Sequence, residues 1–237
     1  MKLRKTINDT LIFIPARSGS KGVKNKNVKD LNGKPLISYT LEFALKNFRK
    51  QDIYISTNCD KVIEIAKGYG LIVSEKRPEE LCTDDSSIYE SITHTINSFE
   101  RKNIFYEKLI MLQPTTPIRK DSDLKEIINL YNSQYDAVIS VVKSKSNPYF
   151  TLYEQKKNGY LKKSKKGNYY RRQDCPNVYE FNGSVFMFNI NSLKKSYVSG
   201  FRKIKKFEME LDYSIDIDDW VDWEVADLLI KRLDKHE

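Results

Sequence analysis

The alternation of short apolar runs with amphipathic stretches constrains the fold of this chain most strongly. Apolar runs occupy 11–14, 109–112 and 137–142, and the first two stop at Pro15 and at Gln113-Pro114. Runs of this length and composition are typical of strands that are buried on both faces. Ile53-Tyr54-Ile55 and the return of apolar residues at 184–188 predict two more strands.

The stretches between these runs repeat their apolar residues at helical spacing. We expect one helix to open at Pro35, a second to follow an Asp60 N-cap and a third to follow an Asp84-Asp85 cap. A fourth covers about 124–131. Helices that alternate with continuous apolar strands predict an α/β fold with a mostly parallel sheet covered on both faces.

The C-terminal part predicts a last helix, with Asp219 as its N-cap. The apolar positions of this helix are Val221, Val225, Leu228 and Leu229. We find no internal repeat and no linker, so the sequence predicts a single domain over 1–237. Ligands of open α/β sheets bind beyond the carboxyl ends of the strands, and we expect the chemistry there.

The pattern breaks after Asn147-Pro148. Residues 149–181 are rich in Lys, Tyr, Asn and Gly and alternate only weakly, as in a protruding β-hairpin or arm. Residues 143–172 carry ten Lys or Arg and one acid, whereas 207–237 carry eleven acids and three bases. Because the net charge of +9 is segregated in this way, it predicts no general nucleic-acid surface, although the basic segment alone fits RNA, a polyanionic small molecule or a solvated hairpin.

Nothing in the sequence points to a membrane or to an oxidising compartment. No apolar run approaches the ~20 residues that span a bilayer, and the apolar stretch before Ala16 is too short for a signal-peptide core. The cysteines are three in number and far apart, without a CxxC pair. We therefore expect a soluble cytoplasmic protein with free thiols and no zinc site.

A cation-rich loop directly follows the first strand. Residues 15–27 contain two glycines, a pair of serines and four cations, namely Arg17, Lys21, Lys24 and Lys26. Backbone N–H groups and ammonium groups in such a loop can surround phosphates, so we favour phosphate binding over a flexible surface turn. The loop is neither a P-loop nor a GxGxxG loop.

Three further polar segments have positions that suit a ligand. Arg77-Pro78, followed by 83–87, fits either base or phosphate recognition or helix capping. The 113–119 segment, Gln-Pro-Thr-Thr-Pro-Ile-Arg, offers amide, hydroxyl and guanidinium donors to a polyhydroxylated ligand. Asp216 and Asp218 alternate in an extended stretch, so they share a face and suit Mg²⁺ bridged to phosphate oxygens. Together the segments indicate a nucleoside-triphosphate enzyme.

In this order, the segments resemble the acylneuraminate cytidylyltransferases, which transfer CMP from CTP to a nine-carbon α-keto sugar acid. The resemblance runs from residue 11 to about 230. It rests on IPARSGSKGVKNKN (14–27), NGKPLI (32–37), ISTNCDKVIEIAKGYG (55–70), RPEELCTDDSS (77–87), LQPTTPIR (112–119), RRQDCPNVYEFNGSVF (171–186) and SIDID (214–218).

The resemblance implies a Rossmann-like nucleotidyltransferase fold and roles for the cationic loop. Arg17, Ser20 and Lys21 would hold the triphosphate, and Arg17 and Lys21 would offset charge on the leaving pyrophosphate. Lys26 and Asn27 would lie near the α-phosphate and the nucleoside. Arg17, Lys21 and Lys26 are thus the catalytic candidates.

It also implies contacts to the base and to the sugar acid. Arg77 and Ser87 would read the cytosine edge. Gln113 would contact the sugar acid, and Asn182 and Phe186 would shape its pocket.

The resemblance further implies a Mg²⁺ cofactor and a homodimer. Asp216 and Asp218 would hold the Mg²⁺ on the phosphates. A dimerisation arm at about 143–181 would reach across to the partner and offer Arg172 to a sugar carboxylate or phosphate there. The expected partners are then CTP and a nonulosonic acid, with no nucleic acid and no membrane.

Two departures from the family pattern lie on the sugar side. Asn147-Pro148-Tyr149-Phe150 lacks a basic residue that often follows the proline, and Phe186 replaces a tyrosine. N-acetylneuraminate, legionaminate and pseudaminate stay open as substrates, with a lean towards legionaminate-type acids. The alternatives are a 3-deoxy-manno-octulosonate cytidylyltransferase and an inactive nucleotide-binding protein with a basic nucleic-acid-binding arm.

Overall fold

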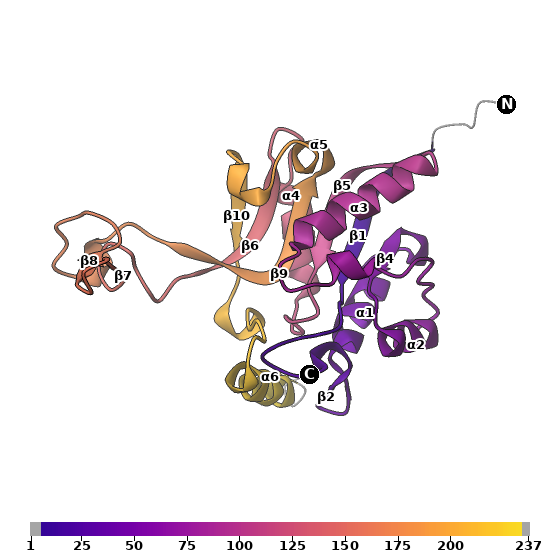
Figure 1. The fold of residues 1–237 in the computed structure, drawn as a ribbon, viewed down its shortest axis with the longest axis horizontal. Helices are drawn as coiled ribbons and strands as arrows, with labels where there is room; N and C mark the ends of the chain where they lie inside the picture. Colours follow the sequence, from indigo (N-terminus) through magenta and orange to yellow (C-terminus); the bar gives the residue numbers. More distant parts are fainter. Residues whose placement is uncertain (1–5, 234–237) are drawn as a thin grey trace.

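The computed structural model describes residues 6–233, so both ends of the predicted 1–237 domain lie outside the described residues. Its centre is a six-stranded sheet in the order β10-β6-β9-β5-β1-β4 (Figure 1). The strands are β1 (Thr6–Pro15), β4 (Ile53–Ser56), β5 (Ile104–Leu112), β6 (Ala137–Lys143), β9 (Tyr179–Asn189) and β10 (Ile204–Glu208). β1 runs parallel to β4 and β5, and β6 runs parallel to β10, whereas β9 is antiparallel to both neighbours. The predicted mostly parallel sheet is confirmed.

Helices cover the sheet on both faces. They are α1 (Leu36–Asn47), α2 (Asp60–Gly68) and α4 (Asp121–Leu130) on one face and α3 (Ile88–Arg101) and α5 (Ile190–Leu193) on the other. The last helix, α6 (Trp220–Leu233), packs outside the sheet in a separate cluster with Leu36 and Ile217. Short 3-10 turns lie at Lys26–Val28, Lys50–Asp52, Glu79–Leu81, Arg172–Asp174, Val198–Gly200 and Leu211–Tyr213. Between residues 6 and 233, no helix has both the length and the apolar character that a bilayer crossing needs.

Alternate residues of β1 supply the two main layers of the core. Ile12 and Ile14 pack with α1, α2 and α4, whereas Leu11 and Phe13 point to the other face and pack with α3 and α5. Both faces of the central strands are therefore buried, which explains why these strands have continuous runs of apolar residues in the sequence.

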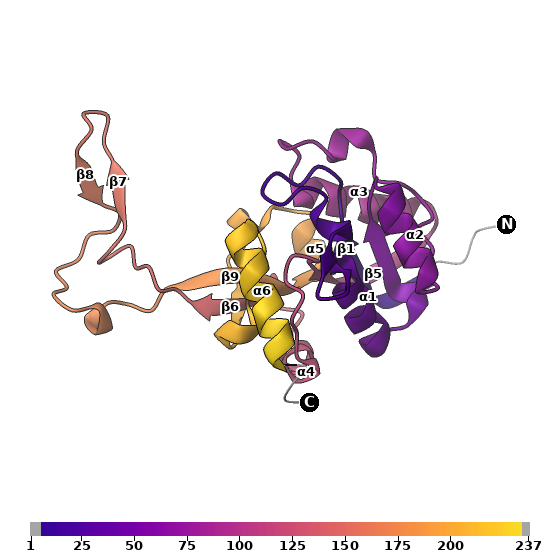
Figure 2. The same ribbon diagram turned by 90° about the horizontal axis from the view of Figure 1, so that it is seen from below.

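The basic segment between β6 and β9 leaves the body of the protein. It forms a two-stranded antiparallel sheet of β7 (Tyr153–Gln155) and β8 (Leu161–Lys163), which projects far from the central sheet (Figures 1 and 2). Two-residue strands β2 (Asp30–Leu31) and β3 (Lys34–Pro35) form a separate turn before α1.

The N-caps differ in part from those that the sequence predicts. α2 has Cys59 rather than Asp60 as its N-cap. The predicted Asp84-Asp85 cap of α3 is wrong, because Ser87 caps this helix in a capping box with Glu90. Asp219 does cap α6, as predicted, since its Oδ1 accepts from the backbone N–H groups of residues 221 and 222.

The predicted helix at the C-terminus is present, but its predicted apolar face is wrong except at Leu229, which packs against the buried cluster. Trp223, Ala226 and Ile230 pack against the body of the protein, whereas Val221 and Leu228 are 69 % and 67 % exposed. Since α6 carries apolar residues on both sides, helical spacing alone did not identify which side packs. The neighbours that α6 packs against decide it.

Replacing Leu41, which is fully buried in α1, should destabilise the fold much more than replacing exposed Leu228. We expect Leu41→Ala to lower the free energy of unfolding by roughly 2–5 kcal/mol, because it removes buried methyl groups and leaves a cavity. Leu228→Ala should cost less than about 1 kcal/mol. Urea unfolding followed by circular dichroism measures both, and equal losses would contradict this assignment of the core.

Candidate functional site

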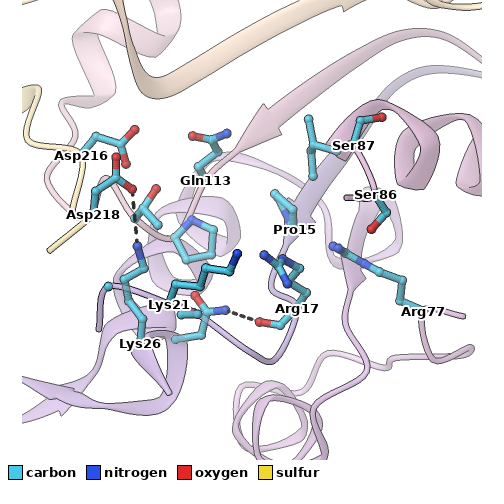
Figure 3. Close-up of a pocket in the computed structure, with 16 residues that line it drawn as sticks. Pro15, Arg17, Lys21, Lys26, Arg77, Ser86, Ser87, Gln113, Asp216 and Asp218 are labelled. Carbon is cyan, nitrogen blue, oxygen red and sulfur yellow. Dashed lines mark hydrogen bonds and ion pairs between the residues drawn. The ribbon is translucent and has the colours of Figure 1, made fainter. Parts of the chain in front are cut away.

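A cavity of about 470 Å³ opens beyond the carboxyl ends of β1 and β5, where the sequence predicts the chemistry. Figure 3 shows Asp216 and Asp218 on one side of the cavity and Arg77, Ser86 and Ser87 on the other. Arg17 and Lys21 lie between the two sides. The residues that line it are Pro15, Arg17, Ser20, Lys21, Gly22, Lys26, Asn27, Arg77, Ser86, Ser87, Ile88, Gln113, Pro114, Thr115, Asp216 and Asp218. The structure thus brings together ten of the thirteen predicted site residues.

The cations at the start of the loop are paired with a carboxylate. Arg17 Nη2 and Lys21 Nζ each lie 2.9 Å from one oxygen of Asp84. Arg17 also donates through Nη1 to the Cys82 carbonyl oxygen at 2.9 Å, and its own carbonyl accepts from Asn27 Nδ2 at 3.1 Å. The loop therefore presents two oriented positive charges to the cavity.

Lys26 has a different environment. Its side chain is only 10 % exposed, and its ammonium donates to the Ile217 carbonyl oxygen and lies 3.7 Å from Asp218 Oδ1. Burial of an ammonium is costly unless it is paired. Lys26 therefore joins the cationic loop to residues 214–219, the acidic segment, and it also lines the cavity.

Gly22 permits the same close approach. A Cβ at Gly22 would lie 1.9 Å from the Asp218 carbonyl oxygen, which is backbone and cannot turn away. The absence of a side chain at this position lets the two segments pack directly against each other.

Asp216 and Asp218 suit a divalent cation. Asp216 Oδ1 is buried without a hydrogen-bond partner, and burial followed by the charge of Asp218 raises the pKa of Asp216. Among the described residues no group of three or more Asp, Glu, His or Cys side chains could hold a metal. Two carboxylates fit Mg²⁺, which commonly takes one or two from the protein and completes its octahedron with phosphate oxygens and water.

Arg77 is fixed at the end of β4. Its guanidinium donates from Nε to Ser56 Oγ at 2.9 Å and from Nη2 to the Ser56 carbonyl oxygen at 2.8 Å. Burial lowers the pKa of Arg77. Ser87 lies on the same side of the cavity, and its hydroxyl oxygen accepts from the Glu90 N–H as a helix cap (Figure 3). Helix capping, one of the two functions that the sequence left open for this segment, is therefore confirmed for Ser87, and recognition of a base or phosphate stays a prediction.

The 113–119 segment divides into a ligand-facing part and a structural part. Gln113 lines the cavity, but Arg119 turns inward and donates to the Ser184 carbonyl oxygen at 3.2 Å and to Thr40 Oγ1 at 3.1 Å. Removal from water lowers the pKa of Arg119 to about 9, so the guanidinium stays charged at neutral pH. The guanidinium does not serve as the ligand donor suggested by the sequence pattern.

Three predicted sugar-side residues do not line this cavity. Asn182 is buried and hydrogen-bonds Ser140 and Ser214, and Phe186 packs in the core. Arg172 lies in the arm, beside a separate cavity at its base.

Asp84, which pairs with two cations of the cavity, was wrongly predicted from the sequence as a helix cap. A signal was present, since Ser87 with Glu90 three residues later is itself a capping-box pattern. That pattern leaves the carboxylate of Asp84 without a role in the helix.

Comparison with known proteins adds family information to this geometry. The family model described as "Cytidylyltransferase" matches residues 11–232. An N-acylneuraminate cytidylyltransferase of Streptococcus agalactiae serotype V is 33 % identical over 88 % of this chain, and the chain spans 50 % of that protein's length. A CMP-N,N'-diacetyllegionaminic acid synthase of Campylobacter jejuni is 31 % identical over 94 % of this chain and 95 % of its own.

A solved structure supports the fold. The structure of a CMP:2-keto-3-deoxy-manno-octonic acid synthetase complexed with CTP matches with a TM-score of 0.70 and 16 % identity. The match covers 95 % of this chain and all of that chain. The two chains therefore share a Rossmann-like nucleotidyltransferase fold.

Gly22→Ala should separate the cationic loop from the acidic segment. Because the new Cβ would overlap a backbone oxygen, we expect a loss of roughly 1–3 kcal/mol in the free energy of unfolding. Gly68→Ala is the matched control, since a Cβ there meets nothing within 4 Å. Thermal and urea unfolding measure both variants, and equal stabilities would show that the two segments are not in tight contact.

Proposed function

This chain belongs to the cytidylyltransferase family, and from that premise we propose that it transfers CMP from CTP to the anomeric hydroxyl of a nonulosonic acid. In this reaction the sugar oxygen forms a bond to the α-phosphorus, and the bond from that phosphorus to the bridging oxygen of pyrophosphate breaks. The relatives named for N-acylneuraminate and for diacetyllegionaminate support an acid of one of these two types.

One observation carries the proposal. A single cavity has a cationic loop beside a pair of carboxylates, and Lys26 and Gly22 hold these two segments in contact. A nucleoside triphosphate with its metal needs both positive and negative side chains in one cavity, because cations neutralise the phosphates and carboxylates hold the metal. Neither segment alone would distinguish such a ligand from any other anion or cation.

We assign the triphosphate to the loop. Arg17, Ser20 and Lys21 bind the β- and γ-phosphates, and the two cations stabilise the charge that develops on the leaving pyrophosphate. Lys26 and Asn27 lie next to the α-phosphate and the nucleoside. Positioning and charge neutralisation then account for most of the catalysis.

Asp216 and Asp218 are the residues that would hold Mg²⁺. The cation, when bound, supplies positive charge to the phosphate oxygens. The buried and unpartnered Asp216 Oδ1 supports this assignment.

We assign Arg77 and Ser87 to the cytosine edge, and their position on the wall opposite the carboxylates supports this assignment (Figure 3). We assign Gln113 to the sugar acid. A Cβ at Gly183 would lie 2.5 Å from Asp216 Oδ2 and 2.8 Å from Gln113 Oε1, so these two side chains converge above that glycine. Asn182 and Phe186 then shape the sugar side from below, through the backbone of β9.

We further propose that the active form is a homodimer in which each arm completes the partner's site with Arg172. The arm extends well away from its own cavity and exposes large side chains, among them Tyr153, Tyr160 and Leu161. Exposed apolar groups on a projecting element are typical of a protein interface. We expect the protein to act in the cytoplasm without a nucleic-acid partner, and its free cysteines fit a reducing compartment.

The test is release of pyrophosphate from CTP and Mg²⁺ with a panel of sugar acids. The panel contains N-acetylneuraminate, diacetyllegionaminate, pseudaminate and 3-deoxy-manno-octulosonate. Release with one nonulosonic acid supports the proposal and identifies the substrate, whereas release only with the octulosonate would replace it. No release with any acid, together with salt-sensitive RNA binding, would instead favour an inactive protein with a nucleic-acid-binding arm.

Asp218→Asn should reduce Mg²⁺-dependent turnover by about a hundredfold or more, because the amide keeps the shape but loses the charge that holds the cation. Steady-state rates over a range of Mg²⁺ concentrations measure the loss. Glu224→Gln, on the exposed surface of α6, is the charge-matched control and should behave as the wild type. Unchanged turnover of the Asp218 variant would remove the metal assignment.

Arg172→Ala should raise the KM for the sugar acid by about tenfold or more and change the KM for CTP little, since a charge-assisted contact to the acid is lost. Arg171→Ala is the matched control, because Arg171 is already paired with Asp174 at 2.9 Å. An equal rise in both KM values would contradict the assignment.

Mixed dimers test whether Arg172 acts across the interface. The Arg172→Ala and Asp218→Asn variants are each impaired, but their heterodimer contains one intact site if the arm serves the partner. Random reassociation should then recover about a quarter of the wild-type rate. No recovery would indicate that the arm does not complete the partner's site.

A further inference from the structure

The carboxylate of Asp84 joins the two cations of the loop. Its Oδ1 lies 2.9 Å from Arg17 Nη2, and its Oδ2 lies 2.9 Å from Lys21 Nζ. Hydrogen bonds from Lys21 and then Arg17 hold the pKa of Asp84 below its ordinary value, so the group is ionised at neutral pH. The Asp84 carboxylate therefore already pairs with Arg17 and Lys21, the two cations that the proposed function assigns to the triphosphate.

Local structure does not account for this pairing. The N-terminus of α3 is capped by Ser87 and Glu90, and Asp84 takes no part in that cap. Asp85, the next residue, is also exposed, and within the described chain no ion pair or hydrogen bond of its side chain is found. Two adjacent aspartates thus have different environments, and only Asp84 contacts the cationic loop.

The cations remain within reach of a ligand. Lys21 is 75 % exposed, and Arg17 and Lys21 both line the cavity, whereas Asp84 does not. The carboxylate thus contacts the two cations from the 82–84 segment and not from inside the cavity. Exposed ion pairs of this kind are weak, so a ligand with several negative charges can displace Asp84.

We propose that Asp84 is a resident counter-ion that the polyphosphate of the substrate displaces, and that regains Arg17 and Lys21 when pyrophosphate leaves. The inference rests on the proposed function and adds a specificity-determining residue to it. A ligand whose phosphates reach Arg17 and Lys21 must break both ion pairs before it gains their charge. A ligand with a single phosphate beside Lys26 and Asn27 leaves the pairs intact.

This displacement has two consequences. CTP and pyrophosphate bind more weakly than they would to a loop without the carboxylate, because part of the attraction offsets the lost ion pairs. Pyrophosphate also leaves more readily, since Asp84 competes with it for the same two cations. The residue therefore favours turnover over tight binding of the product.

The test compares Asp84→Asn with Asp85→Asn. The Asp84 amide keeps the shape of the side chain but removes its charge, and the Asp85 variant removes the same charge one residue away. Calorimetric titrations with Mg²⁺ and CTP, with inorganic pyrophosphate and with CMP are run at one ionic strength. Circular dichroism and a thermal melt establish that both variants fold.

Asp84→Asn should bind CTP and pyrophosphate about three- to tenfold more tightly, since two weak ion pairs no longer need to be broken. CMP affinity should stay within about twofold of the wild type. The inhibition constant of pyrophosphate as a product should fall by the same factor as its dissociation constant. Asp85→Asn should change none of these values by more than about twofold.

Other results overturn the inference. Equal or weaker pyrophosphate binding by Asp84→Asn would show that the carboxylate orients the cations for the ligand and is not displaced by it. A matching gain for CMP, or the same gain in Asp85→Asn, would show only a general effect of charge.

The pyrophosphate titration also separates this inference from the proposed function. A wild-type protein that binds pyrophosphate but not CTP would overturn the cytidylyltransferase proposal. The pyrophosphate affinities of the two variants would still test whether Asp84 is displaced. A wild-type protein that binds neither ligand would overturn both.

Discussion

The contact between the cationic loop and the acidic segment 214–219 is the interaction on which the site depends. The Lys26 ammonium donates to the Ile217 carbonyl oxygen, and Gly22 lets the two backbones approach without a side chain between them. Ile217 is fully buried and its N–H donates to the Thr115 carbonyl oxygen, so the same segment is also attached to the end of β5. A buried ammonium must be paired, and this requirement brings the positive and negative sides of the cavity into one place.

The arginines of the site divide into two kinds. Arg77 and Arg119 are fixed by backbone carbonyls and hydroxyls, since Arg77 bonds Ser56 at the end of β4 and Arg119 bonds Ser184 within β9. Arg17 is partly exposed and bonded to a carboxylate and a carbonyl on one segment. Guanidinium groups with several donors can serve either purpose, and burial decides which. Arg77 lines the cavity in a fixed position, Arg119 lies outside its lining, and Arg17 contributes positive charge to it together with Lys21 and Lys26.

The segregated charge of the chain corresponds to separate parts of the structure. The basic residues between β6 and β9 belong to the projecting arm (Figure 2), whereas the acidic residues described after β10 include Asp216 and Asp218 at the cavity and Asp222, Glu224 and Asp227 on α6. An arm that extends away from its own body exposes basic and aromatic side chains at a distance from the site. This separation explains why the overall net charge is a poor guide to the ligand.

The sequence alone determined most of the central strands and helices and the segments that line the cavity, because apolar period and strand ends are local properties. Five strands of the central sheet, the cationic loop and the Asp216–Asp218 pair were predicted, since each is a pattern of neighbouring residues, whereas the edge strand β10 was not predicted. Only the tertiary structure decided which side of α6 packs and that Arg119 turns inward. It also decided that Asp84 pairs with Arg17, which lies 67 positions away in the sequence. Those outcomes depend on which neighbour the fold supplies, and a charged side chain takes the strongest partner within reach wherever that partner lies in the sequence.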